Sequence, residues 1–232
     1  ILARPTGDLD LRVDIGSYRD DVGGYEEVVI SFPADRVKFE PRGDSLEARF
    51  KPELTVWDDT GKEVKSLKGV RQVRMPKGLR LDGRLIDDVT GFRLPPGTYT
   101  AEVKVGGGKA SGRCKFAFDI PDFKPGRLSL SDIFLARKVA PRDPGPEPGR
   151  FLKGGHVLLP AADRRVKPND PVRFYVELFE IGQLAHTVSF QILDRFGHAV
   201  VEDKREYPTY RDKGRFVEGL PLRDLPPGTY TL

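Results

Sequence analysis

Residues able to act as nucleophiles, general bases or soft metal ligands are few in this sequence. They include one cysteine and three histidines, which are Cys114, His156, His186 and His198. Zinc sites need histidines or cysteines at short, characteristic spacings, and none of these four residues has such a neighbour. A serine hydrolase of the common type would need a Gly-x-Ser-x-Gly turn, which the sequence lacks. We therefore expect no catalytic residue, no metal site and no cofactor, and we expect Cys114 to be buried and inert.

Adjacent carboxylates are the remaining groups that could bind an ion. The pairs that could do so include Asp20-Asp21, Glu26-Glu27, Asp58-Asp59 and Asp87-Asp88. Calcium needs about six to eight converging oxygens, and none of the pairs has the alternating spacing of an EF-hand loop. The segment Asp58 to Gly61 is explained instead by a hairpin turn. The glycine-rich run from Gly106 to Gly112 lacks the helix start and the Lys-Ser/Thr pair of a phosphate-binding loop, so it predicts the tip of a hairpin.

The composition narrows the class of protein. The chain has 232 residues, of which 38% are hydrophobic and 32% charged, and its net charge is +4. Lysine and arginine are interleaved with aspartate and glutamate in both halves, which is typical of a solvated surface and not of a nucleic-acid interface. No apolar run approaches the roughly 20 residues of a membrane helix, so we expect no membrane insertion. The 25 glycines and 20 prolines favour a turn-rich all-β chain.

The strongest structural signal is a heptapeptide, Leu-Pro-Pro-Gly-Thr-Tyr-Thr, that occurs twice. It spans residues 94–100 and, letter for letter, residues 225–231. Its Pro-Gly pair is typical of a type II turn in which the glycine takes a positive φ. A Gly-x-Tyr at the start of a late strand is also typical of the tyrosine corner of an immunoglobulin-like sandwich, in which the ring is buried and the hydroxyl bonds back to the preceding loop. The residues concerned are Pro96, Gly97, Tyr99, Pro227, Gly228 and Tyr230.

Alternating apolar residues predict strands around both copies. A hairpin is expected directly after the first copy, with arms at residues 98–105 and 113–120. The order of strand, Asp-containing turn with glycine, strand and heptapeptide appears twice, and no segment has a sustained helical period. The proline-rich stretch at residues 140–149 predicts an extended loop. The sequence thus predicts an all-β chain of two tandem immunoglobulin-like or fibronectin III-like β-sandwiches, at residues 1–124 and 125–232.

The second predicted sandwich is shorter than the first after the heptapeptide. In the first, the heptapeptide strand is followed by a further strand, whereas the sequence stops at Leu232, two residues after Tyr230. We expect the Leu232 end to border an open edge of the sheet that carries Tyr230. Either the natural chain continues with strand residues, or a partner chain inserts a strand at that edge, as in donor-strand complementation.

Aromatic residues mark a candidate interaction surface in the second half. Phe174, Tyr175 and Phe179 place aromatic side chains on both faces of one predicted strand, and further aromatics follow in a predicted loop region that includes Phe216. One face of the strand is expected to join the core, and the other is a candidate surface for a protein or a glycan. The residues of this candidate surface are Tyr175, Phe179, Tyr207 and Tyr210.

The second half resembles the C-terminal region of bacterial GWxTD-domain proteins, an uncharacterised family. The similarity lies in Leu-Ser-Leu-Ser-Asp-Ile at residues 128–133, in residues 151–160 and in the strand at residues 172–181. It covers about residues 125–232. The Gly-Trp-x-Thr-Asp signature is absent, and the single tryptophan is Trp57. The resemblance implies a β-sandwich exported from a bacterial cytoplasm to the periplasm or the cell exterior, and it transfers no activity.

Two functional hypotheses follow from these observations. In the first, the chain is a non-catalytic exported protein whose sandwiches are structural or protein-binding elements of a larger envelope or surface assembly. In the second, it is a carbohydrate-binding or accessory region of a larger secreted enzyme. An exposed, coplanar aromatic platform would favour a glycan, whereas an apolar patch or an open strand edge would favour a protein partner.

Overall fold

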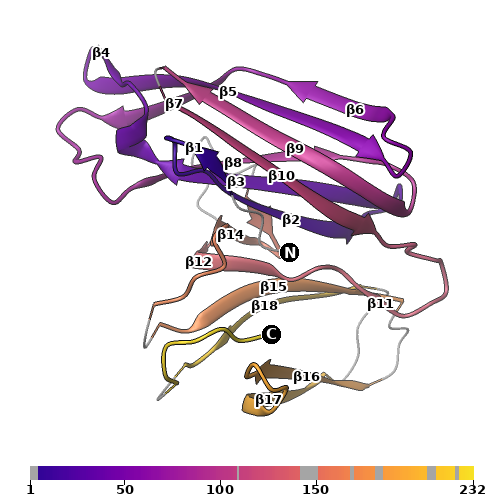
Figure 1. Cartoon of the computed structure of the whole chain (residues 1–232). Helices are drawn as coiled ribbons and strands as arrows, with labels where there is room; N and C mark the ends of the chain where they lie inside the picture. Colours follow the sequence, from indigo (N-terminus) through magenta and orange to yellow (C-terminus); the bar gives the residue numbers. More distant parts are fainter. Residues whose placement is uncertain are drawn as a thin grey trace. The chain divides into compact units, whose positions relative to one another are not determined.

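The structure, a computed structural model, describes residues 5–108, 110–141, 151–167, 170–180, 185–207, 213–222 and 225–232 (Figure 1). The described chain consists of β-strands, their connections and one 3₁₀ turn, Ala34–Arg36, so the prediction of an all-β fold is confirmed. The chain divides into two compact units, Ile1–Asp122 and Phe123–Leu232. None of the described segments is a helix long and apolar enough to cross a bilayer. Most of the predicted proline-rich loop, residues 142–149, lies outside the described residues.

The first unit is built from two antiparallel layers. Its strands are β1 (Thr6–Gly7), β2 (Arg12–Arg19), β3 (Gly24–Pro33), β4 (Glu40–Arg42), β5 (Ser45–Asp58), β6 (Glu63–Lys68), β7 (Arg71–Pro76), β8 (Leu85–Phe92), β9 (Gly97–Gly107) and β10 (Ala110–Ile120). In one layer β9 lies between β10 and β5, and β4, β6 and β7 pair with β5. In the other layer β3 lies between β2 and β8. The groups β2-β3-β8 and β5-β9-β10 correspond to the A-B-E and C-F-G strands of an immunoglobulin-type sandwich.

The core of the first unit lies between these layers. From one layer, Ile30 and Phe32 of β3 face inward and are almost fully buried. From the other, Val56 of β5 and Ala101 of β9 are fully buried directly opposite one another on the same face. These positions follow the two-residue alternation of each strand, which therefore determines which side chains are buried. The hairpin β9–β10 confirms the predicted hairpin, and its strands extend further toward the glycine-rich tip than predicted.

Strand β8 was not predicted from the sequence. Two adjacent aspartates, Asp87 and Asp88, interrupt its apolar pattern. The carboxylate of Asp88 is buried and accepts a hydrogen bond from Nε of Arg71 at 2.9 Å. The carboxylate of Asp87 accepts one from the hydroxyl of Ser31 at 2.6 Å. Because both partners come from other strands, only the tertiary structure makes these aspartates compatible with a half-buried strand.

The second unit also has two layers (Figure 1). Its strands are β11 (Ser129–Leu130), β12 (Phe134–Pro141), β13 (Leu152–Lys153), β14 (His156–Pro160), β15 (Val172–Phe179), β16 (His186–Leu193), β17 (Ala199–Tyr207) and β18 (Lys213–Leu220). The larger sheet has β15 between β12 and β18, with β14 and β13 beyond β12. The smaller sheet is the hairpin β16–β17. The order β12-β15-β18 repeats that of β2-β3-β8 in the first unit.

Large aromatic side chains join the two layers of the second unit. Phe174 of β15 and Phe190 of β16 lie with their ring centroids 5.1 Å apart, and both are buried. Phe216, which was expected in a loop region, lies in β18 and is 2% exposed. Burying each such ring contributes about 1.5–3 kcal/mol, so these residues hold the small sheet against the large one.

Candidate functional site

The tyrosines of the two heptapeptides have the same hydrogen bond. The hydroxyl of Tyr99 donates to the carbonyl oxygen of Pro95 at 2.8 Å, and the hydroxyl of Tyr230 donates to that of Pro226, also at 2.8 Å. Tyr99 is 8% exposed, and burial, together with the nearby negative charge of Asp58, raises the pKa of its hydroxyl. This is the hydrogen bond of a tyrosine corner, and its role is structural.

The glycines before these tyrosines do not have the predicted backbone. Gly97 has a φ of 157°, at the limit of extended backbone, and the φ of Gly228 is not positive, so a type II turn with left-handed glycine is not formed there. A Cβ on Gly97 would lie 3.5 Å from Cε2 of Tyr99, and one on Gly228 would lie 3.3 Å from Cε2 of Tyr230. The first distance is ordinary van der Waals contact and the second is slightly tighter, so a methyl group at either position would touch the tyrosine ring without overlapping it. The adjoining prolines, Pro96 and Pro227, are exposed.

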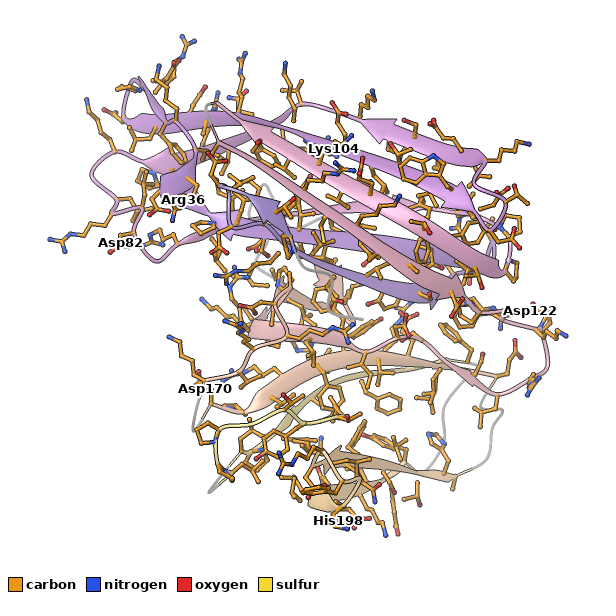
Figure 2. All side chains as sticks on the ribbon, viewed as in Figure 1. Arg36, Asp82, Lys104, Asp122, Asp170 and His198 are labelled. Atoms are coloured by element: carbon orange, nitrogen blue, oxygen red, sulfur yellow. The ribbon has the colours of Figure 1, made fainter. Side chains whose placement is uncertain are left out.

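Asp58 and Asp194 hold the two hairpin turns in the same way. The Oδ1 atom of Asp58 accepts hydrogen bonds from the backbone N–H groups two and four residues later, at 3.1 and 3.0 Å. The Oδ1 atom of Asp194 does the same at 2.8 and 3.0 Å. Hydrogen bonds to the charged form lower the pKa of both carboxyls, chiefly that from the hydroxyl of Thr60 to Asp58 and that from the N–H of His198 to Asp194. His198 lies at the tip of the second hairpin (Figure 2).

The predicted aromatic surface is not formed by the residues of β15. Tyr175 and Phe179 are 2% and 1% exposed. Other side chains cover this second face of β15: Nζ of Lys153 lies 5.5 Å from the centroid of the Tyr175 ring, and the ring of Phe123 lies 5.7 Å from that of Phe179. Tyr207 packs against the ring of Phe216, with centroids 4.8 Å apart. The fourth residue of the predicted surface, Tyr210, lies outside the described residues.

The acidic pairs make hydrogen bonds and salt bridges within the fold and do not come together at one site. One oxygen of Asp20 accepts from the N–H groups of Val22 and Gly23, and Asp20 also pairs with Arg93. The carboxylate of Glu26 accepts from the hydroxyl of Ser17 at 2.6 Å. In the described part of the chain, no group of three or more His, Cys, Asp or Glu is arranged to hold a metal ion.

Cys114 lies in the core of the first unit. It is 1% exposed, and burial raises the pKa of its thiol. Since the thiolate is the reactive form, a buried thiol with a raised pKa is a poor nucleophile. The position of Cys114 in the core therefore gives no support to a nucleophilic role.

A pocket opens between the layers of the first unit. It has a volume of about 310 Å³ and is lined by aliphatic side chains that include Ile30, Leu54 and Val103. Lys68 and Arg71 also line it, and no aromatic residue is among its lining residues. Sugar-binding sites stack pyranose rings on exposed aromatic side chains, so this aliphatic pocket gives no support to the glycan hypothesis.

One edge of strand β16 is the candidate functional site. Along one edge β16 pairs with β17 over its whole length. Along the other edge, the described residues contribute a single partner, Thr231, whose N–H and carbonyl oxygen bond to the carbonyl oxygen and N–H of Leu193 at 2.9 and 2.7 Å. The sequence pointed to the sheet that carries Tyr230 but could not show which strand would present the edge. We call residues 187–191 of β16, on the side of Thr231, the β16 edge.

The two outer edges of this small sheet differ in charge. Strand β17 contains a run of charged residues, Glu-Asp-Lys-Arg-Glu at residues 202–206. Strand β16, with the sequence His-Thr-Val-Ser-Phe-Gln-Ile-Leu, contains no lysine, arginine, aspartate or glutamate. Charged side chains protect exposed edge strands from pairing with other chains. The β17 edge has this protection, whereas the β16 edge lacks it and is suited to pairing.

Comparison with protein-family models and with curated proteins finds no match to this chain. The resemblance of residues 125–232 to GWxTD-domain proteins therefore stays a prediction. The function has to be inferred from the geometry of the two units.

Proposed function

We propose that this protein is a non-catalytic module protein of immunoglobulin-like sandwiches that binds another protein through the β16 edge. The observation that carries the proposal is the contrast between that uncharged edge and the charged β17 edge. An unprotected strand edge offers backbone N–H and C=O groups that only another extended backbone satisfies as a row. By the resemblance of the second half, the proposal places the protein in the periplasm or outside a bacterial cell, as part of a larger assembly.

The repeated geometry supports a structural role for the remainder of the chain. The turns at Asp58 and Asp194, and the hydrogen bonds of Tyr99 and Tyr230, stabilise the ends of strands. Two of the four residues of the predicted aromatic surface, Tyr175 and Phe179, are buried. Protein binding is therefore the hypothesis that the described residues favour.

Site-specific photo-crosslinking in the native host tests this proposal. A photoreactive amino acid replaces Thr187, which is exposed on β16, and in a matched control it replaces Val200, which is 39% exposed on β17. We expect a discrete crosslinked protein with the first variant and none with the second. Equal labelling from both positions, or from neither, would contradict the proposal. A glycan array probed with the unmodified protein tests the alternative hypothesis. Specific sugar binding would favour the accessory-region hypothesis.

A further inference from the structure

We infer that the aliphatic pocket of the first unit binds a fatty acid, with the hydrocarbon chain between the two layers and the carboxylate on the guanidinium of Arg71. This site is separate from the β16 edge. The inference therefore goes beyond the proposed function, and either can fail without the other. The opening of the pocket, its walls and the charged group beside it all fit this ligand.

Pro52 of β5 explains why the sandwich opens at this place. Its carbonyl oxygen accepts a hydrogen bond from the N–H of Gly69 at 3.2 Å, so its backbone nitrogen is directed to the same, outer side of β5. Because that nitrogen carries no hydrogen, the ladder is interrupted there, and the outer strand is divided into β6 and β7. The pocket is lined at this interruption by Gly69 and, from the other layer, by the exposed Gly91 of β8. We call the side of the pocket between these two glycines its mouth.

The inner walls of the pocket are aliphatic. Val28 and Ile30 of β3 line it from one layer, and Leu54 of β5 and Val103 of β9 line it from the other. These side chains are between 2% and 4% exposed, so the pocket reaches the core between the layers. Its volume of about 310 Å³ is roughly twice that of an apolar cavity that takes up benzene. A slender hydrocarbon chain of about eight to twelve carbons therefore matches this space.

The guanidinium of Arg71 is held at the mouth by its neighbours. Its Nε atom donates to the buried carboxylate of Asp88 at 2.9 Å, which ties β7 to β8 across the two layers. Gly69 leaves room for the group, because a Cβ at that position would lie 3.0 Å from Nη1 of Arg71. The side chain of Arg71 is 27% exposed, so it can be reached from solvent.

The outer nitrogens of Arg71 are the anion-binding groups of this site. Among the residues that the structure describes, Nε of Arg71 has a hydrogen-bonded partner, and Nη1 and Nη2 have none. A guanidinium presents paired N–H donors in the geometry of a carboxylate, and such charge-assisted hydrogen bonds are stronger than neutral ones. Two further charged residues that line the pocket, Lys68 and Glu53, pair with each other at 3.8 Å, so their charges offset one another. The mouth therefore suits a carboxylate at the end of an apolar chain.

Titration of the whole chain with decanoate tests the inference. The readout is the NMR signals of the methyl groups of Ile30, Leu54 and Val103, which line the pocket. We expect these signals to shift and to saturate, while those of Ile192, in the core of the second unit, stay in place. Absence of a saturable shift in the pocket, or equal shifts in the two cores, would overturn the inference.

The alcohol 1-decanol separates the contribution of the carboxylate from that of the chain. Hydrogen bonds to charged groups are stronger than those to neutral ones, so we expect 1-decanol to bind about tenfold more weakly than decanoate. Arg71→Lys keeps a cation beside Asp88 and removes the paired donors. We expect this variant to weaken decanoate binding about tenfold and to leave 1-decanol binding unchanged. Equal affinity of the parent for both probes, or an equal effect of the variant on both, would contradict the assignment of the carboxylate to Arg71.

Thr90 of β8 allows the pocket to be filled from a strand at the edge of its sheet. It lies opposite Val28 of β3, lines the pocket and is half-buried. We expect Thr90→Phe to fold and to abolish the shifts caused by decanoate, because its ring takes the space of the chain. The matched control Thr90→Ser leaves that space open and should keep them. If Thr90→Phe fails to fold, Thr90→Leu makes the same test with a smaller side chain. Undiminished binding by a folded variant with the filled pocket would rule out the pocket as the binding site.

Discussion

At the scale of single residues, the hydroxyl of Tyr99 ties the start of β9 to the loop before it. Replacing Tyr99 with phenylalanine removes the hydrogen bond to Pro95 and leaves the ring in place. We expect the unfolding free energy to fall by about 1 kcal/mol, measured by urea denaturation. The matched control is Tyr230→Phe, since the hydroxyl of Tyr230 is exposed and its loss should cost less. A Tyr99→Phe variant with the parent's denaturation midpoint would show that this bond adds nothing.

Burial also determines the reactivity of Cys114. Its thiol is enclosed in the first core, and its pKa is raised by that burial, so little thiolate is present or accessible at neutral pH. We expect a thiol reagent to modify the native protein at least about tenfold more slowly than the urea-unfolded protein. Equal rates in the two states would mean that the strand carrying Cys114 opens readily.

At the scale of elements, the backbone of the hairpin turns needs a glycine with positive φ, whereas the backbone of the second heptapeptide does not. Gly61 has a φ of 82°, which an L-amino acid side chain disfavours, whereas the φ of Gly228 is not positive. We expect Gly61→Ala to lower the unfolding free energy by about 1 kcal/mol and Gly228→Ala to lower it by clearly less. Thermal unfolding of the two variants side by side makes the comparison. The reverse order of the two effects would refute this account of the turns.

The two strands of the small sheet in the second unit differ in charge. The position of Arg205 on β17, where its guanidinium pairs with Asp203 and with Glu218 of β18, shows how the charged strand is fixed within its own unit. Strand β16 has no comparable charges, and its apolar face contributes Phe190 and Ile192 to the core. The proposed binding at the β16 edge rests on this difference between the two adjacent strands.

At the scale of the whole molecule, stability should depend on pH in the acidic range. The pKa of Asp58 is lowered, chiefly by the hydroxyl of Thr60, and that of Glu102 chiefly by the ammonium group of Lys104, with Arg113 adding to it. A folded-state pKa below the unfolded value means that the stabilisation is present above the unfolded pKa and is lost as the pH falls through the folded one. We therefore expect the melting temperature to fall as the pH decreases below about 4.

An amide in place of one carboxylate separates this effect from a general response to acid. Asp58→Asn keeps an oxygen acceptor in the turn and removes the titrating group. We expect its melting temperature to be lower than the parent's at pH 7 and to approach it at pH 3 (about one unit below the usual carboxyl range). A constant difference between the two proteins across this range would show that Asp58 does not contribute to the pH dependence.

The sequence by itself determined the features that depend on neighbouring residues. Two-residue alternation predicted the all-β class, and the repeated heptapeptide predicted hydroxyl bonds that span only four residues, from Tyr99 to Pro95 and from Tyr230 to Pro226. The turn at Asp58 likewise closes within four residues. These interactions are local, so their residue types and spacing are sufficient to predict them.

Only the tertiary structure decided what lies beside each strand. Alternation shows that a strand has two faces, but the burial of Tyr175 and Phe179 depends on Lys153 and Phe123, which pack on the second face of β15. The strand nature of β8 depends likewise on partners for its two aspartates from other strands. The side of β16 that forms the β16 edge is identified by the pairing of Leu193 with Thr231, two residues that are far apart in the chain. The alternation within one strand does not show which distant strand pairs with it, because that pairing is specified by the packing of the whole core.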